Sequence, residues 1–245
     1  MFKKLDITHH IPLLLTGAIR YGEGDHDSFE RLLDSLISFC FRYFTIGNRT
    51  VADLEKQIGL MSKYLRNPLP LEDISENDEE VKTIQNLQDV IDYMCRLTPD
   101  LTFVNNFELF STRNNTLGFY ILNELEKQKR SGVRPLNHGP NQHIEHIMPK
   151  RPSKAQNRMN EWSSVRNSED YNEFKYRVGN LLIIERELNQ RAKNYDFSTK
   201  KEVYEESGLY YPSEIINLDE WDFQSIEKRQ KQMAQDALQV CNYSE

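Results

Sequence analysis

The chain has 245 residues, enough for one large domain or two small ones with a real core, and 31 Lys and Arg against 38 Asp and Glu give a formal charge of −7. This acidic balance argues against a protein dedicated to coating DNA. The first residues do not show the basic start and apolar run of a signal peptide, and no stretch approaches the roughly 20 apolar residues of a membrane span. Because Cys40, Cys95 and Cys241 are scattered without C-x-x-C spacing, we expect a reducing cytoplasm, no disulfide framework and no structural zinc.

The first 130 residues predict a bundle of helices. Apolar residues recur at helical spacing, most clearly over residues 28–44. Further helices are expected over residues 12–19, 50–65, 81–94, 101–110 and 117–129, the second of them capped by Thr50 and Asp53. The Phe, Leu and Met stripes of this part are core positions, and it carries no chemistry of its own.

Domain boundaries follow from composition. Gly, Pro and Asn are frequent in residues 131–141, which predicts a linker. We expect a helical bundle over residues 1–135, a small α+β core over 136–211, and a C-terminal helical segment over 212–245 that packs back on the bundle. The helix of this last segment is expected over residues 224–240. The fold class is therefore mainly α, with an α+β core, and Trp221 is expected to be a core anchor of the last segment.

The most informative stretch is residues 143–150, His-Ile-Glu-His-Ile-Met-Pro-Lys. A carboxylate, Glu145, stands directly before His146. Residues 179–184 then form an apolar, β-branched run behind a Gly-Asn turn, and a polar helical stretch follows over 185–194. Ser198 is expected to cap the next helix, which carries Lys200 and Lys201. The predicted order is strand, strand, helix.

This order resembles the ββα-metal core of HNH (His-Me finger) nucleases. Such nucleases commonly show the nine-residue step that separates Asn180 from Asn189. The resemblance implies that His146 is the general base, that Glu145 and Asn189 hold Mg2+ or Mn2+, and that Asn180 braces the loop that orients His146. The residue types suit this chemistry, because a neutral imidazole accepts a proton near neutral pH and magnesium prefers oxygen ligands.

Charge is distributed unevenly along the chain. From His146 to Lys201 there are twelve Lys and Arg against seven Asp and Glu, a local charge of +5, which leaves −12 on the remainder. This asymmetry fits local phosphate contacts, although clustered charge is also typical of a solvated face. The candidate DNA contacts are Arg191, Lys193, Asn194, Lys200 and Lys201. For Asn194 and Lys200 the alternative is helix capping and surface decoration, and Arg113 has the same two interpretations.

A longer pattern resembles one family, the C-terminal HNH domain of GmrSD-type restriction endonucleases. The helical region that ends in Tyr120-Ile-Leu122 is similar to the part that precedes this domain. The resemblance rests on these segments in order: Ile144-Glu-His-Ile-Met-Pro149, Trp162, Gly179-Asn-Leu-Leu-Ile183, Leu188-Asn189, Asn194, Phe197, Lys200-Lys201 and Tyr204-x-x-Ser207.

The resemblance implies a metal-dependent DNA endonuclease or nickase that restricts modified or phage DNA. Many members of the family carry a separate N-terminal nucleotide-binding domain, and no P-loop is present in this sequence. We therefore expect a nucleotide-binding partner domain or subunit. Many HNH proteins have Asp where this chain has Glu145, and glutamate keeps the carboxylate oxygen.

Three alternatives remain open from the sequence. The chain can be a nuclease-derived DNA-binding or regulatory subunit that cuts only with its nucleotide-binding partner. It can be a helical scaffold in which Glu145 and His146 are structural. Finally, His138, His143 and His146 can form a zinc site, although no cysteine accompanies them.

Overall fold

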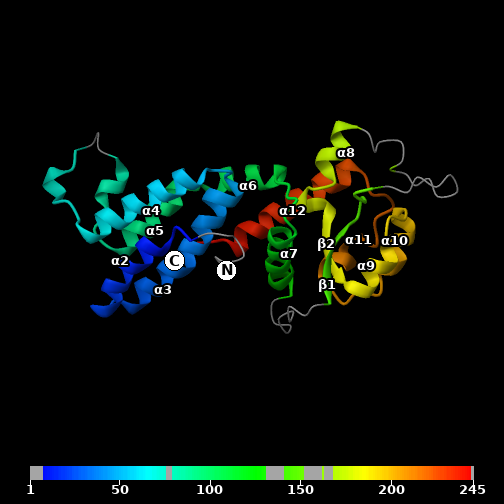
Figure 1. The fold of residues 1–245 in the computed structure, drawn as a ribbon, viewed down its shortest axis with the longest axis horizontal. Helices are drawn as coiled ribbons and strands as arrows, with labels where there is room; N and C mark the ends of the chain where they lie inside the picture. Colours follow the sequence, from blue (N-terminus) through cyan, green and yellow to red (C-terminus); the bar gives the residue numbers. More distant parts are fainter. Residues whose placement is uncertain (1–7, 76–78, 131–140, 152–161, 163–167, 244–245) are drawn as a thin grey trace. The chain divides into compact units, whose positions relative to one another are not determined.

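A computed structural model describes residues 8–75, 79–130, 141–151, 162 and 168–243. These residues are mainly helical, with one antiparallel sheet of two strands (Figure 1). They form two compact units, Met1–Asn106 with Cys241–Glu245, and Phe107–Val240. Within the described residues, no helix combines the length and apolar character needed to cross a membrane.

The first unit is a group of packed helices. In α3 (His26–Phe39), Leu32, Leu36 and Phe39 are fully buried, and this apolar face packs against the neighbouring helices. The other elements of the unit are α2 (Ile11–Gly22), η1 (Cys40–Ile46), α4 (Val51–Arg66), η2 (Leu71–Asp73), η3 (Glu80–Thr83) and α5 (Leu87–Leu97).

The sequence predicts one α-helix over residues 28–44, but the structure changes to a π-helix at Cys40. The π-helix ends at Gly47, whose N–H donates to the Arg42 carbonyl at 2.9 Å. Arg42 is itself buried and donates to the carbonyl oxygens of Thr98 and Cys241. The wider turn thus carries an arginine that ties the C-terminal residues to this unit.

Capping side chains begin two helices of the first unit. Thr50 accepts from the Asp53 N–H and Asp53 returns the bond, which forms a capping box at α4. Asn86 and Asp89 form the same arrangement at α5. The sequence predicts the Thr50 and Asp53 caps correctly.

The second unit contains the sheet. Strands β1 (Gln142–His146) and β2 (Leu181–Glu185) pair antiparallel, with His146 opposite Leu181 and Gln142 opposite Glu185. Residues 181–184 are all buried, which explains their continuous apolar run. The helices of this unit are α7 (Asn115–Lys129), α8 (Glu169–Phe174), η6 (Val178–Asn180), α9 (Arg186–Ala192), α10 (Phe197–Tyr204), α11 (Tyr210–Ile215) and α12 (Phe223–Val240), and α6 (Asp100–Leu109) leads into it.

Helices pack on the sheet from several parts of the chain. α7 contacts both strands, α9 also contacts both, and α10 contacts α9 (Figure 1). Because α7 packs on the strands, it belongs to the unit that contains them, so the division near residue 106 lies earlier in the chain than the linker at 131–141. That linker lies almost wholly outside the described residues.

α12 approaches the turn before β2 very closely. A Cβ at Gly179 would lie 2.5 Å from the Ile226 carbonyl oxygen and 2.8 Å from the Gln230 Cβ, so only glycine fits there. Gln230 accepts a hydrogen bond from the Gly179 N–H at 3.0 Å, and Arg229 donates to the Gly179 carbonyl at 2.6 Å. This packing fixes the backbone immediately before Asn180.

Candidate active site

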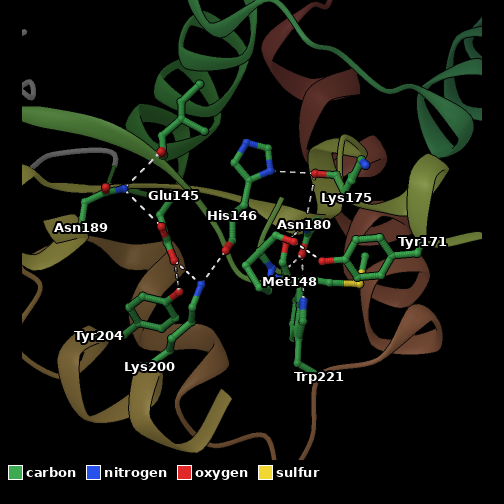
Figure 2. Close-up of polar contacts among 12 residues, drawn as sticks. Glu145, His146, Met148, Tyr171, Lys175, Asn180, Asn189, Lys200, Tyr204 and Trp221 are labelled. Atoms are coloured by element: carbon green, nitrogen blue, oxygen red, sulfur yellow. Dashed lines mark hydrogen bonds and ion pairs between the residues drawn. The ribbon is translucent and has the colours of Figure 1, made fainter. Parts of the chain in front are cut away.

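Glu145 and His146 occupy successive positions of β1, so their side chains point to opposite faces of the strand (Figure 2). One face presents Glu145 to α9 and α10, and the other presents His146 to the segment around Lys175. The site therefore has two halves, joined by one peptide unit.

Glu145 is 6% exposed and accepts hydrogen bonds at both carboxylate oxygens. Oε1 accepts from Lys200 Nζ at 2.5 Å and from the Tyr204 hydroxyl at 3.0 Å. Oε2 accepts from Asn189 Nδ2 at 3.3 Å. Burial raises the pKa of Glu145, while Lys200 and these hydrogen bonds act in the opposite direction.

α10 supplies both partners of Oε1. Lys200 and Tyr204 are four residues apart, which places them on one face of the helix. Lys200 is fully buried and also donates to the His146 carbonyl at 2.7 Å. Burial raises the pKa of Tyr204 well above its ordinary value, so the hydroxyl keeps its proton and donates it to Glu145.

The beginning of α10 differs from the sequence prediction, which gives Ser198 as the cap. Asp196 is the N-cap residue and accepts from the Thr199 N–H at 2.9 Å. The structure thus starts the helix at Phe197, earlier than the predicted cap. This start places Lys200 in the second turn, facing Glu145.

The imidazole of His146 is fixed by a backbone acceptor. Its Nδ1 lies 2.7 Å from the Lys175 carbonyl oxygen, and a carbonyl can only accept, so Nδ1 carries the hydrogen. Burial, together with the nearby Lys150 ammonium, lowers the pKa of His146 to about 3. At neutral pH the ring is therefore uncharged, with its lone pair on Nε2.

Asn180 connects the two chain segments that flank His146 (Figure 2). It is fully buried, and its Nδ2 donates to the carbonyls of Met148 at 2.9 Å and Lys175 at 3.3 Å. Its Oδ1 accepts from the Met148 N–H at 2.8 Å and from Trp221 Nε1 at 3.0 Å. Asn180 thus holds the same carbonyl that orients the histidine.

The residues expected to hold a metal meet, as Asn189 contacts Glu145. Lys200 and Tyr204 both bond to Oε1, which leaves Oε2 on the side of the amide. If the amide turned over, it would present its oxygen in place of Nδ2, and one carboxylate with one amide oxygen is a donor set that suits Mg2+. In the structure Nδ2 also donates to the Ile144 carbonyl at 3.2 Å, a bond that turning the amide would break.

Groups of three or more His, Cys, Asp or Glu that could hold a metal are absent from the described residues. The remaining ligands of an ion at Glu145 and Asn189 would be water and substrate oxygens. His138, considered above as a zinc ligand, lies outside the described residues.

The structure separates the five candidate DNA contacts. Lys200 joins Glu145 in the interior. Arg191 forms a two-pronged ion pair with Glu206, at 2.6 and 2.5 Å, and Lys201 donates to the Leu218 carbonyl at 2.7 Å. Lys193 ends α9 with a positive φ of 45°, and both Lys193 and Asn194 are exposed. Lys200 is thus part of the Glu145 half of the site.

Two residues that contact the site, Tyr204 and Trp221, were not predicted from the sequence to belong to it. The i, i+4 spacing of Tyr204 from Lys200 could have identified Tyr204 as a partner on the same helix face. Trp221 was expected only as a core anchor, and it is 2% exposed. Its bond to Asn180, 41 residues away, has no signal in the sequence.

Comparison with known families places the chain among the nucleases, which are hydrolases. The family model described as "GmrSD restriction endonucleases, C-terminal domain" matches residues 98–236, more than half of the chain. The chain belongs to this family, as its sequence pattern predicts. No curated protein matches it.

Proposed function

We propose that this chain is a metal-dependent DNA endonuclease or nickase with a ββα-metal (HNH) core formed by β1, β2 and α9. The observation that carries the proposal is the position of His146. Its uncharged ring is held by the Lys175 carbonyl, one residue from a carboxylate that contacts Asn189. Family membership supports nuclease chemistry at this site.

His146 acts as the general base for the attacking water. Nε2 accepts the proton, while Nδ1–H stays bonded to the Lys175 carbonyl, which favours the imidazolium that forms. The neighbouring Lys150 and Lys175 ammonium groups oppose this charge in the free protein. A DNA phosphate at the site offsets them, so the imidazole becomes a better base when substrate is bound.

Glu145 and Asn189 are the residues that would hold Mg2+ or Mn2+. Such an ion draws negative charge from the phosphodiester oxygens as it develops. Lys200 and Tyr204 fix the Glu145 carboxylate through Oε1 and so orient Oε2 toward Asn189. Asn180 has a positioning role, because it braces the segments on both sides of His146.

The substrate proposed from the family pattern is modified or phage DNA, and the proposed partner is a nucleotide-binding domain or subunit. One observation favours a second function, a DNA-binding or regulatory subunit that cuts only with that partner. The Lys200 ammonium already compensates the Glu145 carboxylate, and it opposes a second cation nearby. A partner that moves α10 would relieve this opposition.

A supercoiled-plasmid assay with Mg2+ and then Mn2+ tests the proposal, on ordinary DNA and on phage-type modified DNA. His143→Ala is the matched control for His146→Ala, because His143 is an exposed histidine of the same strand. We expect metal-dependent nicking or linearisation by wild type and His143→Ala, and at least about a hundredfold loss in His146→Ala. Activity that persists in His146→Ala would overturn the assignment of the base. Metal-independent DNA binding without cutting on either DNA would favour the second function.

A further inference from the structure

The ring of Tyr176 lies among three positive charges. The Arg113 guanidinium is 4.8 Å from the ring centroid, the Lys175 ammonium 5.4 Å and the Lys150 ammonium 5.8 Å. The His146 ring meets the same tyrosine edge to face, at 6.0 Å between centroids. We name Arg113, Lys150, Lys175 and Tyr176 the Tyr176 cluster.

Backbone contacts bring Arg113 to this place from a distant part of the sequence. The Thr112 N–H donates to the Tyr176 carbonyl at 2.9 Å, and Ser111 forms a β-bridge with Arg177. On the other side of Arg113, Asn114 caps α7 through the N–H groups of Thr116 and Leu117. Arg113 is thus held between a bridge and a helix start.

The other cations are also anchored close to the candidate base. Lys175 donates to Asn172 Oδ1 at 2.7 Å, and its carbonyl is the acceptor for His146. Lys150 follows Pro149, whose carbonyl accepts from the buried hydroxyl of Tyr171. The three cations therefore come from three separate segments that converge beside one histidine.

These charges act on one another. Besides burial, Arg113 and Arg151 lower the pKa of Lys175, and Lys150 and Lys175 lower that of His146. The carboxylate closest to Lys175 in the sequence, that of Glu173, is paired with Arg177. The electron-rich face of Tyr176 offsets only part of this repulsion, so an added anion would relieve it.

We infer that the Tyr176 cluster binds the phosphates of the DNA strand that passes His146. This inference rests on the proposed function, because it takes the strand to be cut as the occupant. Arg113 and Lys150 are exposed, so phosphate oxygens can reach them, and arginine forms two-pronged bonds with phosphate. Contacts with phosphate do not distinguish between bases, so the cluster is expected to bind DNA of any sequence.

Fluorescence anisotropy with a labelled duplex, in EDTA and over a range of salt concentrations, tests this inference. Arg113→Ala and Lys150→Ala should each weaken binding about tenfold at low salt, the scale of a lost charged hydrogen bond. Each should also reduce the slope of log K against log salt by about one. The loss should be equal for modified and unmodified duplexes.

Arg186→Ala is the matched control. Arg186 is an exposed arginine that follows β2 beside Gln142, at the other end of the sheet from His146. We expect it to bind like wild type, with the same salt slope. Thermal melts should show that all three variants are folded, since each removes an exposed side chain.

Unchanged binding in Arg113→Ala and Lys150→Ala, or an equal loss in Arg186→Ala, would overturn the inference, as would tighter binding of an RNA duplex of the same length. The plasmid assay separates this failure from that of the proposed function. If the chain cuts DNA but the cluster variants bind like wild type, the proposed nuclease function stands and the inference about the Tyr176 cluster is rejected. If the cluster variants lose affinity as predicted but the chain does not cut DNA, the inference about the cluster stands and the nuclease activity of this chain is rejected.

Discussion

Lys200 Nζ lies 2.5 Å from Glu145 Oε1, and the Lys200 side chain is 0% exposed while that of Glu145 is 8% exposed. A lysine expected at the surface thus neutralises the carboxylate beside the candidate base. The two members of a buried ion pair depend on one another, because removal of either leaves the other charge uncompensated. The pair therefore links the stability of α10 to the geometry of the site.

Lys200→Met should lower the free energy of unfolding by about 3 kcal/mol or more, because it leaves a buried carboxylate without its counter-charge. In a Glu145→Gln background the same change should cost less, since no charge is then stranded. Urea unfolding of the four proteins of this cycle measures the difference. Equal costs in both backgrounds would show that the two residues are not coupled.

Lys201→Met is the control for that cycle. Lys201 is the next residue on α10, and its ammonium donates to the Leu218 carbonyl at the surface and lies 5.3 Å from the centroid of the Phe197 ring. We expect a loss below about 1 kcal/mol, as for most surface substitutions. A loss as large as that of Lys200→Met would indicate a general sensitivity of α10.

Local patterns predicted much of the fold. The helix expected over residues 224–240 is α12, Phe223–Val240, and that expected over 101–110 is α6, Asp100–Leu109, because apolar spacing is a local property. The two strands were also recognisable, one by its apolar run and the other by the residues that it carries. The π-helix at Cys40 was missed, because its residues keep the same apolar spacing as an α-helix.

The site was predictable only where the family pattern is local. Glu145, His146, Asn180 and Asn189 were located from short motifs and their spacing. The burial of Lys200 was not predicted, since a lysine in a polar helix is normally exposed and its buried partner is distant in the sequence. The Tyr176 cluster was also missed, because Arg113 is brought to Tyr176 by the bridge between Ser111 and Arg177, which are more than sixty residues apart in the sequence.

Asn180→Ala should destabilise the second unit by about 2 to 4 kcal/mol, because it leaves buried partners of both Asn180 atoms unsatisfied. It should also reduce cutting, since the Lys175 carbonyl that holds His146 loses its brace. Calorimetry and the plasmid assay measure the two effects.

Asn217→Ala is the control for that substitution, as Asn217 is an exposed asparagine of the same unit. Its loss in stability should be below about 1 kcal/mol. If Asn180→Ala were as stable and as active as Asn217→Ala, the bracing role would be refuted.

Asp196→Ala should lower stability by about 1 kcal/mol at neutral pH, the usual cost of a lost N-cap. The hydrogen bonds from Thr199, opposed by burial, lower the pKa of Asp196 in the folded chain. Its charge therefore stabilises the fold above the unfolded value of about 3.9, and this contribution is lost as pH falls through the lowered folded pKa.

Thermal melts from pH 7 to pH 2 should show the gap between wild type and Asp196→Ala closing at acid pH. Asp196→Asn keeps an acceptor without a titrating group, so its offset from Asp196→Ala should stay constant with pH. A gap between wild type and Asp196→Ala that is independent of pH would mean that the carboxylate charge does not contribute.

Asn189→Ala should weaken metal binding without unfolding the chain, because it removes one of the two proposed ligands and leaves Glu145 with Lys200 and Tyr204. A metal that binds the folded state raises the melting temperature as its concentration exceeds its dissociation constant. We therefore expect Mn2+ to raise the melting temperature of wild type, with about tenfold more Mn2+ needed for the same rise in Asn189→Ala. Gln190→Ala, an exposed neighbour on α9, should respond like wild type. Cutting by Asn189→Ala should recover in part at high metal concentration, whereas an Mn2+ response equal to that of wild type would place the metal away from Asn189.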